Sequence, residues 1–433
     1  MRTEAEGVAA IERWFRKALA AVDPVRAVTA HLEMNPGWLR VDGRRVPIEG
    51  RLFVIAVGKA AAGMASGAAL VCGDAIAAGI ALTNDGHLAN STPREFESFE
   101  AAHPIPDARG VAATDRILSV VTSAGPGDVV LVLLSGGGSA LLEAPRDGVT
   151  LSDIATTTEL LLRSGAPIQH LNAVRIPLSR VKGGGLRAAA PDARFVTLLL
   201  SDVLGNDPRV IASGPTVPSA FTGANALSLL ETYSVLDRAP PAVVVALRVA
   251  ANEDGFAAYE DDVVAVVGDN ATAVNAFVSA AEEEAVPARV TWSAKEGEAR
   301  ALASEWVAAC LASDLNVNLL LGGGEATVAV RGEGIGGRNT EFTLAAALEL
   351  ERLGNRDWIV ASLATDGQDG PTGAAGAIAT PSTLDRARAT GLDPASCLDR
   401  NDSFRLFERV GGAAITGPTG TNVNDIYVAL RIG

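Results

Sequence analysis

Short apolar runs alternate along this chain with alanine-rich stretches that have the spacing of helices. The apolar runs are continuous rather than interleaved with polar residues, which is typical of strands buried on both faces of a parallel sheet. The expected strands cover residues 51–57, 79–85, 128–134, 194–202, 261–269, 315–324, 358–367 and 424–430. A chain with this order of elements folds as helical layers around a central sheet, so the sequence predicts an α/β protein.

The length and one proline-rich segment predict two domains. The chain has 433 residues, enough for two to three ordinary domains. Residues 237–243, "DRAPPAV", interrupt the pattern with adjacent prolines, and we interpret them as the linker. We expect an N-terminal domain over residues 1–240 with a Rossmann-like parallel sheet, a second α/β domain over residues 241–433, and a cleft between them.

The charge of the chain limits its partners. The sequence holds 36 Lys and Arg against 51 Asp and Glu, so its net charge is −15. An acidic chain repels nucleic acids and anionic membranes, and no apolar run reaches the ~18 residues of a membrane span. The three scattered cysteines and the missing signal-peptide pattern predict a cytoplasmic protein with reduced thiols. The sequence leaves a homo-oligomer open.

Two glycine triplets stand at the ends of expected strands. They are Gly136, Gly137 and Gly138, flanked by Ser135 and Ser139, and Gly322, Gly323 and Gly324, followed by Glu325. Successive glycines let backbone N–H groups converge on an anion, and a helix N-terminus adds positive potential. The alternative is a pair of tight turns in which glycine only supplies positive φ. The P-loop pattern GxxxxGK[ST] is absent and no GxGxxG follows the first strand, which disfavours the common ATP and NAD loops.

Cations stand beside glycines at two places in the first half of the chain. Lys59 follows Gly58 at the end of the first clear strand, where ligands of open α/β sheets bind. The alternative is a solvated lysine at a strand end. Arg175, Arg180 and Lys182 run into the glycines 183–185 and are a candidate anion clamp, unless they form salt bridges to the acidic surface.

Arg338 and Asn339 follow paired glycines in "GIGGRNTEF" and open an expected helix. Arginine is a natural bidentate partner for carboxylate or phosphate, whereas Asn339 is either a ligand or the N-cap of that helix. Asn424 lies in "TGPTGTNVND", which we interpret as a hydrogen-bonding loop or as an ordinary loop before the last strand. These residues extend the set of candidate ligands into the second half of the chain.

Asp202 and Asp366 each end an expected strand, and Asp207 and Asp369 follow shortly after them. Carboxylates at strand ends hold Mg²⁺ against phosphates or accept a proton from an alcohol. The alternative is a turn that the aspartate stabilises. The four histidines show no metal-ligand spacing, and "LSGGGSA" is not the GxSxG of a hydrolase nucleophile. We therefore expect neither a zinc site nor a histidine-based triad.

Seven ordered motifs resemble those of one family. They are "VIAVGKAAAGMA", "LLSGGGSALL", "LNAVRIPLSRVKGGGL", "SDVLGNDPRVIASGPT", "LLLGGGEATVAVRGEGIGGRNTEF", "ATDGQDGPTGAAGA" and "TGPTGTNVND". Together they extend over nearly the whole chain, and the sequence is similar to the glycerate 2-kinase family with a MOFRL C-terminal domain. Some members of that family have been labelled hydroxypyruvate reductases.

The resemblance implies two α/β domains around a deep cleft. It implies a reaction in which ATP and D-glycerate give 2-phosphoglycerate and ADP with a divalent metal, usually Mg²⁺. It assigns the family's cleft lysine to Lys59, its "GGRN" arginine to Arg338 and its aspartate to Asp202, with Asp207 as the next acid. The 2-hydroxyl as acceptor comes from the resemblance alone.

Our hypothesis joins the residues to this reaction. Lys59 and Arg338 bind the glycerate carboxylate or neutralise charge on the transferred group. Asp202, with Asp207 or Asp366, positions the metal or accepts the hydroxyl proton. The other candidate substrate- or phosphate-binding residues are Ser135, Gly136, Gly137, Gly138, Ser139, Arg175, Lys182, Gly322, Gly323, Gly324, Glu325, Asn339 and Asn424. The alternatives are an NAD(P)H-dependent hydroxypyruvate reductase, a kinase for a related sugar acid and a non-catalytic nucleotide-binding protein.

Overall fold

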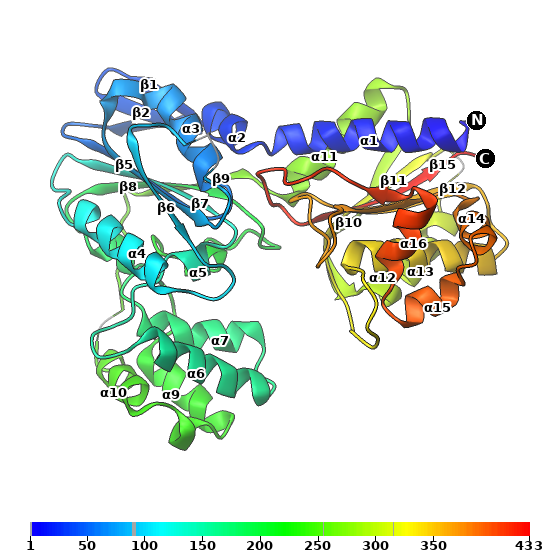
Figure 1. Cartoon of the computed structure of the whole chain (residues 1–433). Coiled ribbons are helices and arrows are strands. Elements are labelled where there is room, and N and C mark those ends of the chain that lie inside the picture. Colours follow the sequence, from blue (N-terminus) through cyan, green and yellow to red (C-terminus); the bar gives the residue numbers. More distant parts are fainter. Residues whose placement is uncertain (1, 89–91, 254, 315) are drawn as a thin grey trace. The chain divides into compact units, whose positions relative to one another are not determined.

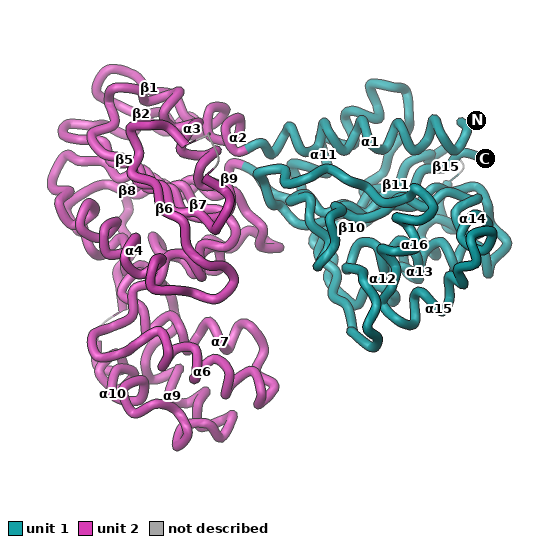
Figure 2. Tube along the Cα trace, viewed as in Figure 1, with its two compact units in different colours: residues 1–23, 268–433 teal, residues 24–267 magenta. Residues whose placement is uncertain are grey.

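The computed structural model describes residues 2–88, 92–253, 255–314 and 316–433, so residue 315 of one expected strand lies outside the described residues. The chain forms two compact units (Figure 2). Unit 2 covers Pro24–Val267, and unit 1 combines the residues up to Asp23 with Gly268–Gly433. The chain therefore passes from one unit to the other twice.

Unit 2 is built on a six-stranded sheet in the order β6-β5-β4-β7-β8-β9. Its strands are β4 (Leu52–Val57), β5 (Ile76–Asn84), β6 (Phe96–Ala101), β7 (Val129–Ser135), β8 (Arg194–Leu200) and β9 (Val263–Gly268). The pairs from β6 to β8 are parallel. Every residue of β4 and β7 is buried, which explains their unbroken apolar sequence. The predicted Rossmann-like sheet is confirmed.

The remaining elements of unit 2 are helices and one small sheet. The helices are α2 (Pro24–His31), α3 (Ala61–Cys72), α4 (Ala108–Val121), α5 (Gly138–Leu141), α6 (Leu151–Arg163), α7 (Ile168–Arg175), α8 (Gly185–Ala188), α9 (Gly223–Thr232) and α10 (Pro241–Ala250). An antiparallel sheet joins β1 (Leu32–Asn35), β2 (Trp38–Val41) and β3 (Arg44–Pro47). Helices α6, α7, α9 and α10 form a separate group (Figure 1) with a core of their own that includes Leu161, Leu171 and Leu247.

Unit 1 contains a mixed sheet in the order β10-β11-β15-β12-β13-β14. Its strands are β10 (Ala288–Glu298), β11 (Leu319–Thr327), β12 (Trp358–Ala364), β13 (Gly376–Ala379), β14 (Ala413–Ala414) and β15 (Asp425–Arg431). Only β10 and β11 pair in parallel; the other four pairs are antiparallel. The expectation of parallel strands is therefore wrong for this half, because burial on both faces makes a strand apolar whatever its direction.

Helices cover both faces of this sheet (Figure 1). They are α1 (Glu4–Ala21), α11 (Asn270–Glu283), α12 (Ala299–Leu311), α13 (Arg338–Arg352), α14 (Thr383–Ala389), α15 (Pro394–Asp399) and α16 (Ser403–Val410). The N-terminal helix α1 packs on α11, with the rings of Trp14 and Phe277 5.9 Å apart. The Thr421 hydroxyl donates to the Val22 carbonyl (2.7 Å) at the end of this helix. These contacts explain why α1 belongs to unit 1.

The compact units divide the chain differently from the predicted ranges 1–240 and 241–433. The proposed linker "DRAPPAV" lies inside unit 2, where Pro240 is the N-cap of α10 and Pro241 its first residue. Proline suits this position because the first helical N–H has no partner in the helix. Val243 is fully buried. The adjacent prolines begin a packed helix, and the linker interpretation is wrong.

Candidate active site

Unit 2 has a topological switch point between β4 and β7. The sheet grows from β4 to β5 and β6 on one side, and from β7 to β8 and β9 on the other. Ligands of open α/β sheets bind at such a point, outside the carboxyl ends of the strands. Lys59 follows β4, Ser135 ends β7 and Asp202 follows β8. The structure thus brings these three predicted residues to one edge of the sheet.

The segments that follow β4 and β7 are bound to each other. The backbone N–H of Lys59 donates to the Gly136 carbonyl (2.9 Å), and that of Ala60 donates to the Ser135 hydroxyl (3.0 Å). Gly58, at φ 124°, lies so close to Ser135 that a side chain has no room. The backbone of Lys59 is therefore fixed beside the loop that carries the first glycine triplet.

Groups of the protein itself crowd the first glycine triplet. A Cβ atom at Gly136 would collide with the Asp202 carboxylate, and one at Gly138 would lie 2.6 Å from the Cβ of Ala212. Gly137 has φ 86°, a left-handed conformation that glycine adopts at low cost. The triplet is therefore needed to pack Asp202 and Ala212 onto the loop. Anion binding by its backbone stays a prediction.

The helix that follows this triplet is the single turn α5. Its N-cap residue, Gly137, makes no side-chain capping bond, and one turn supplies little of the dipole of a long helix. The Ser139 hydroxyl shares a hydrogen bond with that of Ser213 (2.8 Å). Ala212 and Ser213 have left-handed φ angles of 51° and 62°. Such conformations are uncommon for residues other than glycine and cluster at functional sites.

His103 is a residue of this edge that the sequence analysis missed. It follows β6, and its ring lies against Gly137 and close to the side chain of Lys59. Burial, and then the charges of Lys59 and His87, lower the pKa of His103, so its imidazole is neutral at pH 7. We did not expect β6 because its sequence, "FESFEA", interleaves polar residues at the sheet edge. Aromatic residues are enriched in strands, so the presence of its two phenylalanines was the available signal.

The cations of the predicted anion clamp all lie beside carboxylates of the protein. The Lys182 ammonium lies 2.8 Å from the Glu143 carboxylate, and both side chains are only 1% exposed. Arg175 is 3.9 Å from the same carboxylate, whereas Arg180 pairs with Asp115 at the surface (2.6 Å). The alternative of salt bridges to the acidic surface describes Arg180, whereas Glu143 lies buried between Lys182 and Arg175. Anion binding by Arg175 and Lys182 stays a prediction.

Asp207 is bound by a neighbouring arginine. Arg209 donates to both carboxylate oxygens, from Nε to Oδ1 (2.9 Å) and from Nη2 to Oδ2 (2.7 Å). These bonds lower the pKa of Asp207 below its ordinary value. A metal ion at Asp207 would have to compete with this cation, and a metal role for Asp207 stays a prediction.

Arg338, in unit 1, begins α13 and is held by two carboxylates. Its Nε and Nη2 donate to Asp425 (2.6 and 3.0 Å), and its Nη1 donates to Glu325 (2.6 Å). Burial alone would lower the pKa of Arg338, but Asp425 and Glu325 raise it above its ordinary value, so the guanidinium stays charged. These bonds use three of its five N–H groups, so two others can bind a carboxylate or phosphate.

Asn339 and Asp369 secure the start of α13. The buried Asp369 carboxylate accepts the backbone N–H groups of Asn339 and Thr340 (2.8 Å each). The N-cap position itself belongs to Gly337, so Asn339 is not the N-cap. Its side chain donates to Asp425 instead (3.1 Å) and thereby supports the carboxylate that holds the neighbouring arginine.

Asp366 and Asn424 lie in the loops next to this group. The Asp366 carboxylate accepts the backbone N–H of Gln368 (2.9 Å), the turn that the alternative interpretation described. Asp366 is also close enough to influence the pKa of Arg338. Asn424 is buried, and its carbonyl accepts the N–H of Thr365 (3.1 Å). A ligand role for either residue stays a prediction.

The second glycine triplet lies inside strand β11. Gly322, Gly323 and Gly324 pair with residues of β15, and Gly322 and Gly324 also pair with residues of β10; none of the three has positive φ. Successive N–H groups of an extended strand point in opposite directions, so the expected nest is not formed. A Cβ atom at Gly323 would collide with the side chain of Asn270, and one at Gly324 would collide with the Lys295 carbonyl.

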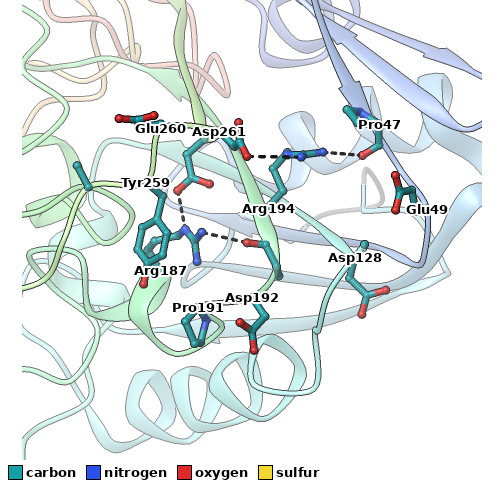
Figure 3. Close-up of a pocket in the computed structure, with 14 residues that line it drawn as sticks. Pro47, Glu49, Asp128, Arg187, Pro191, Asp192, Arg194, Tyr259, Glu260 and Asp261 are labelled. Carbon is teal, nitrogen blue, oxygen red and sulfur yellow. Dashed lines mark hydrogen bonds and ion pairs between the residues drawn. The ribbon is translucent and has the colours of Figure 1, made fainter.

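A cavity of about 440 Å³ lies at the opposite edge of the unit 2 sheet (Figure 3). Its lining residues include Asp128, just before β7, and Arg194, at the start of β8. Its cations are paired inside the protein: Arg187 with Asp262 (2.5 Å), and Arg194 with the Pro47 carbonyl (3.2 Å). No predicted site residue lines this cavity, so it is separate from the candidate active site.

A metal ion and a membrane were both considered in the sequence analysis. Among the described residues, no three His, Cys, Asp or Glu side chains are grouped as a metal site. Mg²⁺ takes only one or two carboxylates and completes its shell with waters and substrate phosphates, so Asp202 at the switch point fits such an ion.

Within the described ranges, no helix is both long and apolar enough to cross a membrane.

Known proteins match this chain over nearly its whole length. Residues 10–248 match a family described as "Domain of unknown function (DUF4147)", and residues 318–425 match the MOFRL family. A protein of Thermotoga maritima named "D-glycerate 2-kinase" is 38% identical over 96% of both chains. A protein of Agrobacterium vitis named "Putative hydroxypyruvate reductase" is 38% identical over 97% of this chain and 93% of the other. The crystal structure of glycerate kinase from Thermotoga maritima matches with a TM-score of 0.88 and 37% identity, over 99% of this chain and 100% of that one.

The fold and the comparisons agree on a class of protein. A parallel sheet with a lysine, a glycine loop and a carboxylate at its switch point defines an α/β protein with a candidate ligand site there. The chain belongs to the glycerate kinase family, with its DUF4147 and MOFRL regions. The resemblance of the seven sequence motifs to this family is thereby confirmed.

Proposed function

We propose that this protein is a kinase that transfers a phosphoryl group from ATP to the 2-hydroxyl of D-glycerate, giving 2-phosphoglycerate and ADP. The observation that carries the proposal is the full-length likeness to a protein named D-glycerate 2-kinase. The arrangement of Lys59, the first glycine triplet and Asp202 at one sheet edge supports it.

Phosphoryl transfer requires positioning and charge stabilisation more than a covalent nucleophile. Lys59, whose backbone is fixed by Gly136, brings a positive charge to the switch point. Arg338 offers two further N–H groups toward a carboxylate or phosphate. We propose that these cations bind the glycerate carboxylate or the transferred group. Asp202 accepts the hydroxyl proton or takes part in metal binding.

The family's reaction implies a divalent cation, which we propose to be Mg²⁺. Asp202 is the carboxylate that would hold it in unit 2, because it follows β8 at the switch point and lies against the first glycine triplet. When bound, the ion neutralises charge on the phosphates. We propose the cytoplasm as the compartment, because Cys72, Cys310 and Cys397 are buried free thiols.

The direct test is an ADP-release assay with ATP, Mg²⁺ and D-glycerate, followed by ³¹P NMR of the product. We expect the signal of 2-phosphoglycerate, with Lys59→Ala as the inactive control. A 3-phosphoglycerate signal would retain the kinase and reject the 2-hydroxyl as acceptor. No ADP release, together with NADH or NADPH oxidation on hydroxypyruvate, would reject the kinase in favour of the reductase activity that some relatives' names suggest.

A further inference from the structure

His103 differs from the other three histidines of the chain in its hydrogen bonding. The rings of His31, His87 and His170 are hydrogen bonded to the Ala27 carbonyl (2.8 Å), the Asp85 carbonyl (3.0 Å) and the Tyr233 hydroxyl (2.7 Å). In the described part of the chain, neither ring nitrogen of His103 has such a partner. His103 is exposed whereas the other three are half-buried, so its ring is accessible to a ligand that binds at this edge of the sheet.

The ring of His103 lies on the candidate active site. A Cβ atom at Gly137 would be 3.2 Å from Cδ2 and 3.3 Å from Nε2 of His103, and 3.3 Å from Cγ of Lys59. These contacts are tight, so a side chain at Gly137 would press on both residues. The edge of the imidazole that carries Nε2 therefore rests on the glycine loop, next to the lysine of the switch point.

We propose that His103 is a further substrate-contacting residue, whose Nε2 hydrogen bonds to an anionic oxygen, of a phosphate or of a carboxylate, held at the first glycine triplet beside Lys59. A neutral imidazole carries one donor and one acceptor, so it contacts such an oxygen as a donor. The proposal rests on the proposed function, which supplies ATP phosphates and the glycerate carboxylate as the two sources of that oxygen.

NMR of the full chain labelled with ¹⁵N-histidine tests the contact directly. MgATP and sodium D-glycerate are added in separate titrations, with sodium chloride to match ionic strength, and calorimetry of the same samples reports binding. The signals of His103 are assigned by their loss in His103→Gln. We expect them to shift with saturation in one titration, while His31 and His170 stay unchanged. A shift of the His103 signals with MgATP would identify a phosphate as the partner, and a shift with D-glycerate would identify the carboxylate.

Two negative results separate the two proposals. If calorimetry detects binding of both ligands and the His103 signals do not move, only the His103 proposal is overturned. If neither MgATP nor D-glycerate binds, the proposed function fails and the His103 contact falls with it.

Steady-state kinetics provide the second measurement. His103→Ala should raise the KM of one substrate ~10-fold or more, because a hydrogen bond to a charged group is lost. His103→Gln keeps an N–H donor and should recover most of that loss. His170→Ala is the matched control, because its ring is bonded to the Tyr233 hydroxyl within the protein and does not act on His103, and its KM values should stay within about twofold of wild type. Unchanged KM values in a folded His103→Ala protein would overturn the contact; if that variant does not fold, the titrations of the wild-type chain decide.

Discussion

The two glycine triplets have the same sequence but differ in structure, because one lies in a loop after a strand and the other lies within a strand. Gly136–Gly138 follow β7, and their loop packs against Asp202 and Ala212 at the switch point. Gly322–Gly324 lie within β11, which pairs with a strand on each side. The first triplet makes room for Asp202 and Ala212 at the candidate active site, and the second lets a neighbouring strand and a helix approach.

The difference teaches how a glycine run should be interpreted. In both triplets glycine is required because groups of the protein itself occupy the space of a Cβ atom. That requirement says nothing by itself about a ligand. What separates the two is whether the chain leaves the sheet at the glycines, because only then can neighbouring N–H groups point the same way.

The largest effect is expected beside the second triplet, at Arg338. Arg338→Ala leaves the fully buried Asp425 without its cation, which should lower the free energy of unfolding by about 3–5 kcal/mol and reduce activity as well. The measurement is urea denaturation together with kcat/KM. Adding Asp425→Asn should restore much of the stability without restoring activity. Equal stability of Arg338→Ala and wild type would contradict the ion-pair description.

Beside the first triplet, Lys59→Ala should reduce kcat/KM by ~10²–10³, the range typical of losing one electrostatic contact in the transition state. Its stability should change little, because the backbone bond from Lys59 to Gly136 does not need the side chain. The exposed Lys17→Ala is a matched control and should remain fully active. Activity of Lys59→Ala near wild type would remove this lysine from the mechanism.

Gly136→Ala addresses the first triplet itself. The added methyl group displaces the Asp202 carboxylate, and a misplacement of about 1 Å near the reacting groups can reduce the rate ~10²-fold. The side chain of Asp202 can rotate away, so the cost in stability should be smaller than the loss of kcat. A variant with normal kcat would show that the position of Asp202 is unimportant.

Gly324→Ala is the corresponding change in the second triplet. Its methyl group meets the carbonyl of Lys295 on β10, and backbone in a sheet cannot rotate aside as a side chain does. Overpacking of this kind costs about 1–3 kcal/mol, which thermal unfolding would detect. The folded fraction should keep its kcat. A stable variant with reduced kcat would reverse the roles that we assign to the two triplets.

The smallest effect is expected at Asp207. Asp207→Asn removes a carboxylate that is paired with Arg209 near the surface, so kcat/KM and Mg²⁺ dependence should change by no more than about twofold. A strong increase in the Mg²⁺ concentration needed for activity would instead assign Asp207 to the metal and weaken the choice of Asp202.

The sequence predicted the central strands better than the edge strands. Strands β4, β7, β8, β11, β12 and β15 were expected, and they are buried on both faces. The edge strands β6 and β10 were missed, because each has exposed positions that break the apolar run. Because β6 was not expected, the position of His103 at the end of a strand was not recognised either.

By itself the sequence determined the α/β class, the family and the strand-end positions of Lys59 and Asp202. Those features depend on local patterns. A strand that is buried on both faces has a continuous apolar sequence, and the family motifs occur in a fixed order along the chain. Only the tertiary structure decided the mixed direction of the second sheet, the place of α1 in unit 1, the burial of Lys182 against Glu143 and the approach of His103 to Gly137. Each of these depends on pairing between segments distant in sequence, which no single apolar run or motif records.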